Sequence, residues 1–99
     1  MFKALDPLLH SELRLALMSI LIGVESAGFV YLREQTGATA GNLSVQIDKL
    51  QKAGYIEVEK TFRGKMPHTI CRITPQGISA FDEYVAAIRG YLNVSTDKK

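Results

Sequence analysis

Residues 39–53 carry side chains that could form hydrogen bonds with the bases of a DNA duplex. Asn42, Ser44 and Gln46 are uncharged and hydrogen-bonding, and Lys49 follows them. The amides of Asn and Gln suit the donor–acceptor pair of adenine, and lysine reaches phosphates. Polar residues on the outward face of a helix are also often simply hydrated. This pattern alone therefore does not separate a reading surface from an ordinary solvated one.

A second group of residues with a possible role follows closely. Four cations and no carboxylate lie between Lys60 and Thr74, and His68 adds a fifth positive charge when protonated. Gly64 and Pro67 have turn chemistry, so they predict a narrow ribbon with a basic tip. Such a ribbon suits a minor groove, where arginine gains from the negative potential. The cations are Lys60, Arg63, Lys65 and Arg72, and the two nearer the base, Lys60 and Arg72, are expected to face phosphates. A charged loop that maintains solubility is the alternative, but the two groups in succession favour nucleic-acid binding.

Two short helices around a tight turn are predicted to position the polar face. The first covers 29–36 and ends at Gly37, and Thr39 is expected to cap the second. This arrangement is a helix-turn-helix, in which the second helix, here about 39–53, lies in the major groove with its first residues at base edges. Thr39 is therefore also a candidate DNA contact. The inward residues of the second helix follow helical spacing: Leu43, Ile47 and Leu50.

Alternating residues predict the basic ribbon itself. Ile56 and Val58 fall on one side of a strand, whereas Glu57 and Glu59 fall on the solvated side. The strand returns over 69–74 with Cys71 inward, so its thiol is expected to be buried and inert, and the wing is placed at about 61–69. Thr74 and Pro75 have the types expected at the start of a final helix.

The first helix is expected to begin at Asp6 and Pro7, with Ser11 as an alternative start. One apolar stripe runs along it, and further apolar residues lie off this stripe. Because 99 residues can bury little on two faces of one helix, we interpret the second face as a contact with another subunit. The alternative is that the last helix of the same chain covers it. The stripe comprises Leu9, Leu13, Ala16, Leu17, Ile20, Leu21 and Val24, and the second face comprises Leu8, Leu15, Met18 and Ile22.

Length and composition exclude several classes of protein. The 99 residues predict one domain spanning 1–99, and the net charge of +2 alone indicates no partner. Cys71 is the only cysteine, so we expect no disulfide, no thiolate metal cluster and a reducing cytoplasm. We expect no membrane span, no signal peptide and no cofactor. His10 and His68 lack partners with metal-ligand spacing, and no nucleophile, phosphate-loop or metal-hydrolase motif occurs, so an enzyme is not expected.

The ordered combination of these motifs resembles the winged helix-turn-helix transcriptional regulators of the small MarR/ArsR-like kind. The resemblance is carried by LREQTGATAGNLSVQIDKLQKAGYIEVEKTF (32–62), RGKMPH (63–68) and ITPQG (73–77). It implies a mainly α fold with a small β-hairpin (α+β), in the order α-α-α-β-β-α. It also implies a homodimer that binds double-stranded DNA at a pseudo-palindromic operator. The implied base readers are Asn42, Ser44, Val45, Gln46 and Lys49, and the implied wing contacts are Arg63, Lys65 and His68. The dimer would form through the first and last helices, with Leu8, Leu15, Met18, Ile22, Phe81, Tyr84, Ile88 and Leu92 as the contact residues.

The chain also departs from that family in three respects. Gln46 stands where relatives often have Arg or His, which makes affinity more dependent on the wing. The cysteine-rich helix of metal-sensing relatives is missing, and the flanking helices that enclose an effector pocket are short. Two alternatives remain open: a winged-helix protein-interaction module, and a repressor with a ligand pocket at the dimer contact. That pocket would be lined by Leu15, Met18, Phe81 and Tyr84.

Overall fold

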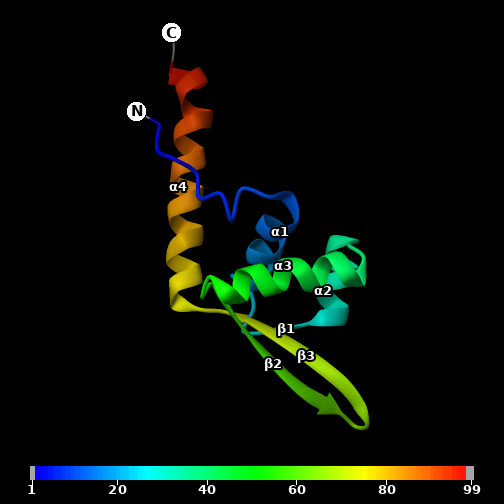
Figure 1. Ribbon diagram of the computed structural model, residues 1–99. Helices are drawn as coiled ribbons and strands as arrows, with labels where there is room; N and C mark the ends of the chain where they lie inside the picture. The colour runs from blue at the N-terminus through cyan, green and yellow to red at the C-terminus, as the bar shows by residue number, and fades with distance from the viewer. Residues whose placement is uncertain (1, 98–99) are drawn as a thin grey trace.

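The computed structural model describes residues 2–97 and confirms the winged helix-turn-helix fold (Figure 1). Four helices and three strands occur in this range, and together they form the expected α+β architecture. The strand β1 is an addition to the order predicted from the sequence. The elements in chain order are α1 (Glu12–Leu21), β1 (Ala27–Gly28), α2 (Phe29–Thr36), α3 (Ala40–Lys52), β2 (Ile56–Arg63), β3 (Met66–Ile73) and α4 (Pro75–Asp97).

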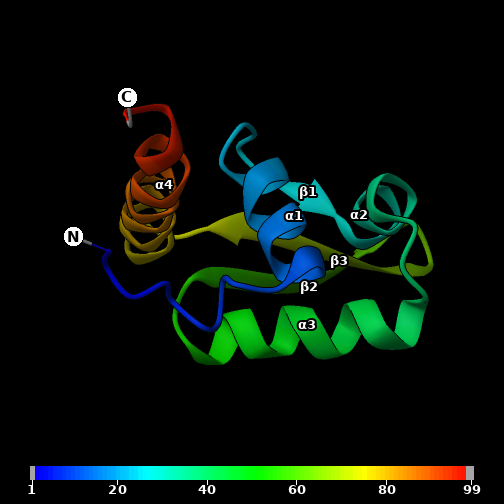
Figure 2. The same ribbon diagram turned by 90° about the horizontal axis from the view of Figure 1, so that it is seen from above.

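The molecule is elongated because two elements project from a small helical body. Its extents are 61 × 25 × 20 Å. Figures 1 and 2 show α4 along one end and the β2–β3 hairpin, the wing, projecting away from it. Between them, α1, α2 and α3 bury a core with the base of the sheet. Fully buried core residues include Leu17, Leu21, Leu32, Leu43, Leu50, Ile56 and Cys71.

The sheet has the order β1-β3-β2, with antiparallel pairing throughout. The register of the hairpin runs from Ile56 opposite Ile73 to Arg63 opposite Met66. The two residues of β1 pair with Cys71 and Ile70, and this strand was not predicted from the sequence. A side chain at Gly28 would place its Cβ 2.9 Å from Cε1 of His68, so glycine lets β1 lie close to the hairpin.

Of the two starts predicted for α1, the structure has the alternative at Ser11. The helix begins at Glu12 with Ser11 as its N-cap, rather than at Asp6. Asp6 caps only a single turn, because its Oδ1 accepts from the Leu8 N–H at 3.0 Å. Its Oδ2 accepts from the Tyr55 hydroxyl at 2.6 Å. That hydrogen bond is the main reason that the pKa of Tyr55 rises to about 12, and burial adds to the rise.

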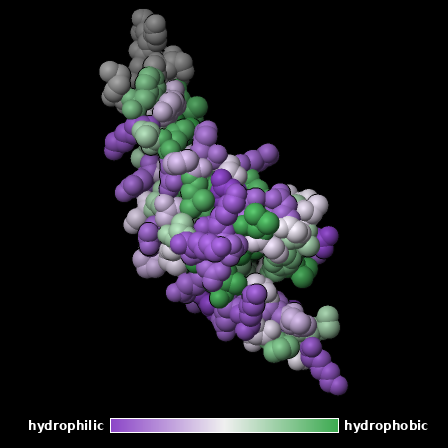
Figure 3. All heavy atoms as spheres, viewed as in Figure 1, coloured by the Kyte–Doolittle hydropathy of each residue, from purple (hydrophilic) through white to green (hydrophobic). Residues whose placement is uncertain are grey.

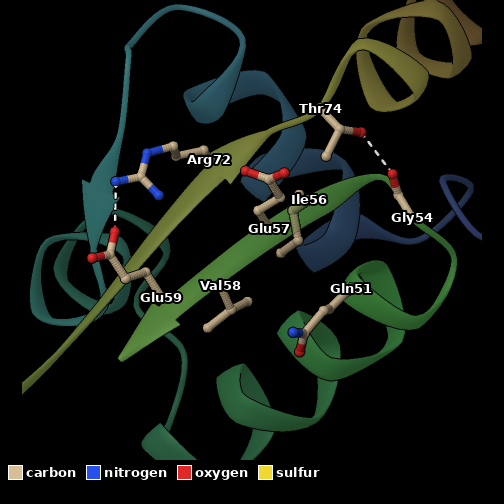
Figure 4. Close-up of a pocket in the computed structure, with 8 residues that line it drawn as sticks. All are labelled: Gln51, Gly54, Ile56, Glu57, Val58, Glu59, Arg72 and Thr74. Carbon is tan, nitrogen blue, oxygen red and sulfur yellow. Dashed lines mark hydrogen bonds and ion pairs between the residues drawn. The ribbon is translucent and has the colours of Figure 1, made fainter. Parts of the chain in front are cut away.

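The sequence Thr74-Pro75-Gln76-Gly77 forms the corner between the wing and α4. Oγ1 of Thr74 accepts from the Gly77 N–H at 2.9 Å, which confirms Thr74 as the cap. The same hydroxyl donates to the Gly54 carbonyl at 2.6 Å, a bond visible in Figure 4. A Cβ at position 77 would lie 2.1 Å from the Tyr55 carbonyl oxygen, so only glycine fits there. The direction of α4 is thereby fixed relative to the end of α3.

The segment before α1 lies along α4. The Tyr91 hydroxyl donates to the Lys3 carbonyl at 3.0 Å, and the rings of Phe2 and Tyr91 are 4.7 Å apart. Nδ1 of His10 and the Tyr84 hydroxyl form a hydrogen bond of 2.8 Å. A segment of the same chain therefore covers part of the α4 surface.

The predicted dimer contacts need correction at two positions. Met18 is fully buried and Tyr84 is 5 % exposed within a single chain, so neither is accessible to a second subunit. Their apolar groups belong to the chain's own core. The other predicted contacts retain some exposure: Leu8, Leu15, Phe81 and Ile88 are half-buried, and Ile22 and Leu92 are exposed.

Candidate nucleic-acid interface

The outward face of α3 forms the centre of the candidate interface. The predicted inward residues Leu43, Ile47 and Leu50 are buried, which confirms the orientation of the helix. Helical geometry places Val45 on the opposite side, where its side chain is half exposed. A methyl-bearing side chain at this point can contact the methyl group of thymine.

The start of α3 is capped as the sequence predicts. Oγ1 of Thr39 accepts from the Asn42 N–H at 3.1 Å, and Gly37 ends α2 with a φ of 72° in the left-handed region. The Thr39 hydroxyl oxygen is therefore engaged in capping, although its proton is available for a phosphate or base. The Asn42 side chain is exposed in the first turn.

The flank of α3 that faces α1 carries a chain of hydrogen bonds that the sequence did not reveal. Arg14, at the start of α1, donates from Nε to the Leu8 carbonyl and from a terminal nitrogen to Oε1 of Gln46, each at 2.5 Å. Nε2 of Gln46 donates in turn to Oδ1 of Asn42 at 2.9 Å. Gln46 is half-buried, so this predicted base reader directs its amide along the helix surface toward α1 and Asn42.

The opposite flank of α3 borders a groove beside the wing. Ser44, a predicted base reader, lines this groove together with Lys60 of β2 and Thr69 of β3. Asp48 also lines it and forms an ion pair of 3.0 Å with Lys52. Asp48 was not among the predicted DNA contacts, although a carboxylate can accept a hydrogen bond from the N4 amino group of cytosine. This flank thus offers a cation, a hydroxyl and an acid to a bound duplex.

The wing tip is a two-residue turn of Gly64 and Lys65. Gly64 has a φ of 65°, as expected at the first central position of a type II′ hairpin turn. Arg63 and Lys65 are exposed there, as predicted. Phe62 and Met66 are 70 % and 69 % exposed, which the sequence analysis did not predict. Figure 3 shows apolar surface next to the hydrophilic end of the wing.

The base of the wing differs from the tip. Arg72, expected to face phosphates, forms an ion pair of 2.7 Å with Glu59, and Figure 4 shows this pair beside Glu57. Its charge is therefore partly compensated at the base of the wing. His68 is half-buried in β3 beside Gly28, apart from the two tip cations. Within the wing, Lys60, Arg63 and Lys65 are exposed, and the ion pair with Glu59 involves Arg72 instead.

The remaining sites considered from the sequence are the Cys71 thiol, possible metal ligands and a pocket near α4. Cys71 is fully buried, and burial raises the pKa of its thiol to about 11. Within residues 2–97 no three histidine, cysteine or acidic side chains are grouped so that they would hold a metal ion. A hollow lined by residues 4–7 with Tyr55, Ala80, Glu83 and Tyr84 contains one of the residues predicted for a pocket at the dimer contact, Tyr84, and not the other three. No described helix combines the length and apolar character needed to cross a membrane.

Comparison with known proteins places the fold among DNA-binding proteins. The chain is 34% identical over 79 residues to the uncharacterized protein MJ0432 of Methanocaldococcus jannaschii, covering 80% of this chain and 86% of that protein. Its structure is similar to that of a transcriptional regulator homologue of Pyrococcus horikoshii, with a TM-score of 0.83 and 23% identity over 89% of this chain and 87% of the other.

Two further solved structures share the fold at lower identity. A MarR-family transcriptional regulator of Enterococcus faecalis has a TM-score of 0.77 and 18% identity over 93% of this chain and 83% of its own. The regulator MosR of M. tuberculosis, solved in complex with DNA, has a TM-score of 0.70 and 14% identity over 94% and 66%. Residues 13–92 match the family described as winged helix DNA-binding domain, and the chain therefore belongs to that family.

Proposed function

We propose that this chain is a sequence-specific regulator of transcription that binds double-stranded DNA as a homodimer. In each subunit α3 enters the major groove, and the wing lies along the backbone or in the adjacent minor groove. Two-fold symmetry would separate the two copies of α3 by about one turn of DNA, roughly 34 Å. The family is one of DNA-binding domains rather than enzymes, and the proposal assigns the chain no catalytic step.

The observation that carries this proposal is the combination of α3 with the wing. The exposed polar residues Asn42 and Ser44 lie in the first turns of α3, where a recognition helix meets base edges. The exposed cations Arg63 and Lys65 lie at the end of the wing, where they can reach phosphates or a minor groove. Lys60 lines the groove between the two elements, so a sugar–phosphate strand lying there would meet a positive charge.

The dimer is supported by apolar surface that remains along α4 and the segment beside it. Leu92 is 64 % exposed, and Phe2, Ile78 and Tyr91 are also exposed. Exposed apolar side chains that form a patch usually mark a contact surface. The half-buried predicted contacts Leu15 and Ile88 are compatible with such a surface.

A selection of bound fragments from random duplex DNA tests the function directly. We expect enriched fragments with two related half-sites about one helical turn apart, and a binding constant that falls steeply as salt rises. Sedimentation equilibrium at the same concentrations tests the dimer. The DNA-binding proposal fails if purified protein binds no duplex in dilute buffer. Enrichment of single half-sites by a monomer would retain DNA binding and overturn the dimer.

The alternative is a winged-helix module that binds protein. The exposed acidic pair Glu57 and Glu59 favours it slightly, because carboxylates beside the wing oppose close approach of phosphates. Replacing both with Gln distinguishes the two functions. A DNA-binding protein should bind duplexes somewhat more tightly after this change, whereas a protein-interaction module would gain no affinity for DNA.

A further inference from the structure

We infer that Arg14 determines which hydrogen-bonding group Asn42 presents to DNA, acting through Gln46. The inference rests on the proposed function and deepens it, because it predicts the kind of base edge read at one position. Arg14 belongs to α1, outside the helix-turn-helix, and is half-buried beneath the α3 flank. It is therefore a positioning residue and not itself a base contact.

The direction of each hydrogen bond follows from the first donor. A guanidinium has only N–H donors and no acceptor. The group of Gln46 that lies 2.5 Å from Arg14 must therefore be its carbonyl oxygen. This orientation leaves the NH₂ group of Gln46 on the side of Asn42, where it lies 2.9 Å from Oδ1. The oxygen of Asn42 is thereby directed to Gln46.

The remaining group of Asn42 determines its chemistry toward DNA. With its oxygen bonded to Gln46, the exposed Asn42 side chain presents two N–H donors outward. Donors match the O6 and N7 acceptors of guanine and the O4 acceptor of thymine. The paired donor–acceptor contact with adenine also requires the oxygen, and the bond from Gln46 occupies one of its two lone pairs and directs it along the surface of α3. Asn42 is therefore assigned to an acceptor-rich base edge, in contrast to the adenine contact suggested by its residue type.

Replacing the Gln46 amide with a carboxylate tests this assignment. Gln46→Glu keeps a partner for Arg14 but offers only oxygens to position 42. Asn42 must then turn its NH₂ group inward and present its oxygen to the duplex. Asn42→Asp presents an outward oxygen by a different route, since Gln46 can still donate to it. Gln76→Glu is the matched control, because it makes the same change at an exposed position of α4, outside α3 and the groove beside the wing.

Each variant is put through the same selection from random duplexes. The wild-type protein and Gln76→Glu are expected to share a preference for guanine or thymine at one position of each half-site. Gln46→Glu and Asn42→Asp should both shift that position by about tenfold toward cytosine or adenine, whose amino groups donate. The inference is overturned if Gln46→Glu retains the wild-type preference, or if Gln76→Glu shifts it equally.

A measurement without DNA separates this inference from the proposed function. In ¹⁵N-labelled protein, Arg14→Met should move the side-chain amide resonances of both Gln46 and Asn42, and Arg14→Lys should preserve them in part. Unchanged resonances in Arg14→Met would refute the hydrogen-bond chain even if the protein binds DNA. Shifted resonances in a protein that ignores duplexes would instead retain the chain and refute the DNA-binding function.

Discussion

The α1-facing flank of α3 and the tip of the wing are both polar, yet their side chains are held very differently. On the flank, Arg14, Gln46 and Asn42 are linked by consecutive hydrogen bonds of 2.5 and 2.9 Å. At the tip, the cations Arg63 and Lys65 are exposed on a two-residue turn. A fixed amide distinguishes base edges, whereas an exposed cation attracts any phosphate. Under the proposed function, we therefore expect sequence preference from the flank and general affinity from the wing.

Removing the wing charges should have the largest effect. Arg63→Ala combined with Lys65→Ala is expected to weaken binding to all duplexes by at least about tenfold, and to reduce the salt slope by about one for each lost phosphate contact. Fluorescence anisotropy over a range of salt concentrations measures both quantities. Lys3→Ala, an exposed cation outside the interface, is the control. Unchanged affinity and slope in the double variant would remove the wing from the interface.

Removing Arg14, where the chain of hydrogen bonds begins, should lower the free energy of unfolding. The wing variant should leave that free energy within about 0.5 kcal/mol of the wild-type value. Arg14→Met removes charged hydrogen bonds to the Leu8 carbonyl and to Gln46. We expect the free energy of unfolding to fall by about 1–3 kcal/mol, measured by urea denaturation. Arg33→Met, at an exposed arginine of α2, should change it little. If Arg14→Met had the same free energy of unfolding as the wild type, the hydrogen bonds of the flank would hold its side chains no more firmly than those of the wing are held.

Removing the amide at the end of the flank should alter preference more than affinity. Asn42→Ala is expected to flatten the base preference at one position of each half-site by about tenfold while the salt slope stays the same. Competition between duplexes that differ at that position provides the measurement. If Asn42→Ala instead weakens binding to every duplex equally, the division of roles between flank and wing is wrong.

The smallest effect concerns pH and a contact remote from both surfaces. The pKa of Tyr55 is raised to about 12, first by its hydrogen bond to Asp6 and then by burial. A raised pKa means that this contact contributes stability below pH 10, and that the contribution is lost as pH rises toward 12. Tyr55→Phe should therefore show less loss of stability than the wild type between pH 10 and 12 in denaturation experiments. Identical pH profiles would show that the Asp6 contact contributes nothing.

The helix caps, the end of α2 and the alternation of β2 could be predicted because the residues that specify each of them lie within a few positions in the sequence. Thr39 and Thr74 each accept a hydrogen bond from an N–H three residues ahead, as their positions before a helix predict. Gly37 ends α2 in the left-handed region. Alternation in β2 placed Ile56 in the core and left Glu57 exposed. Each of these outcomes depends on nearest-neighbour geometry that the residue types themselves carry.

Long-range contacts decided the rest. Two residues of β1 carry too little pattern to be recognised, and they form a strand only because β3 lies beside them. The sequence left two starts open for α1, and the structure has the one at Ser11, while the Asp6 carboxylate accepts from Leu8 and from Tyr55, 49 residues away. Met18 and Tyr84 were predicted as subunit contacts, but both side chains are buried in the core of the single chain.

The sequence by itself thus determined the order of the helices and the wing, their caps, and the types of polar group available for DNA. Periodicity and capping are local properties of the chain, so they can be read without knowing the fold. Only the tertiary structure decided which of those polar groups face outward and which are already bonded. The Gln46 amide meets Arg14 across 32 residues of sequence, and no local pattern specifies that meeting.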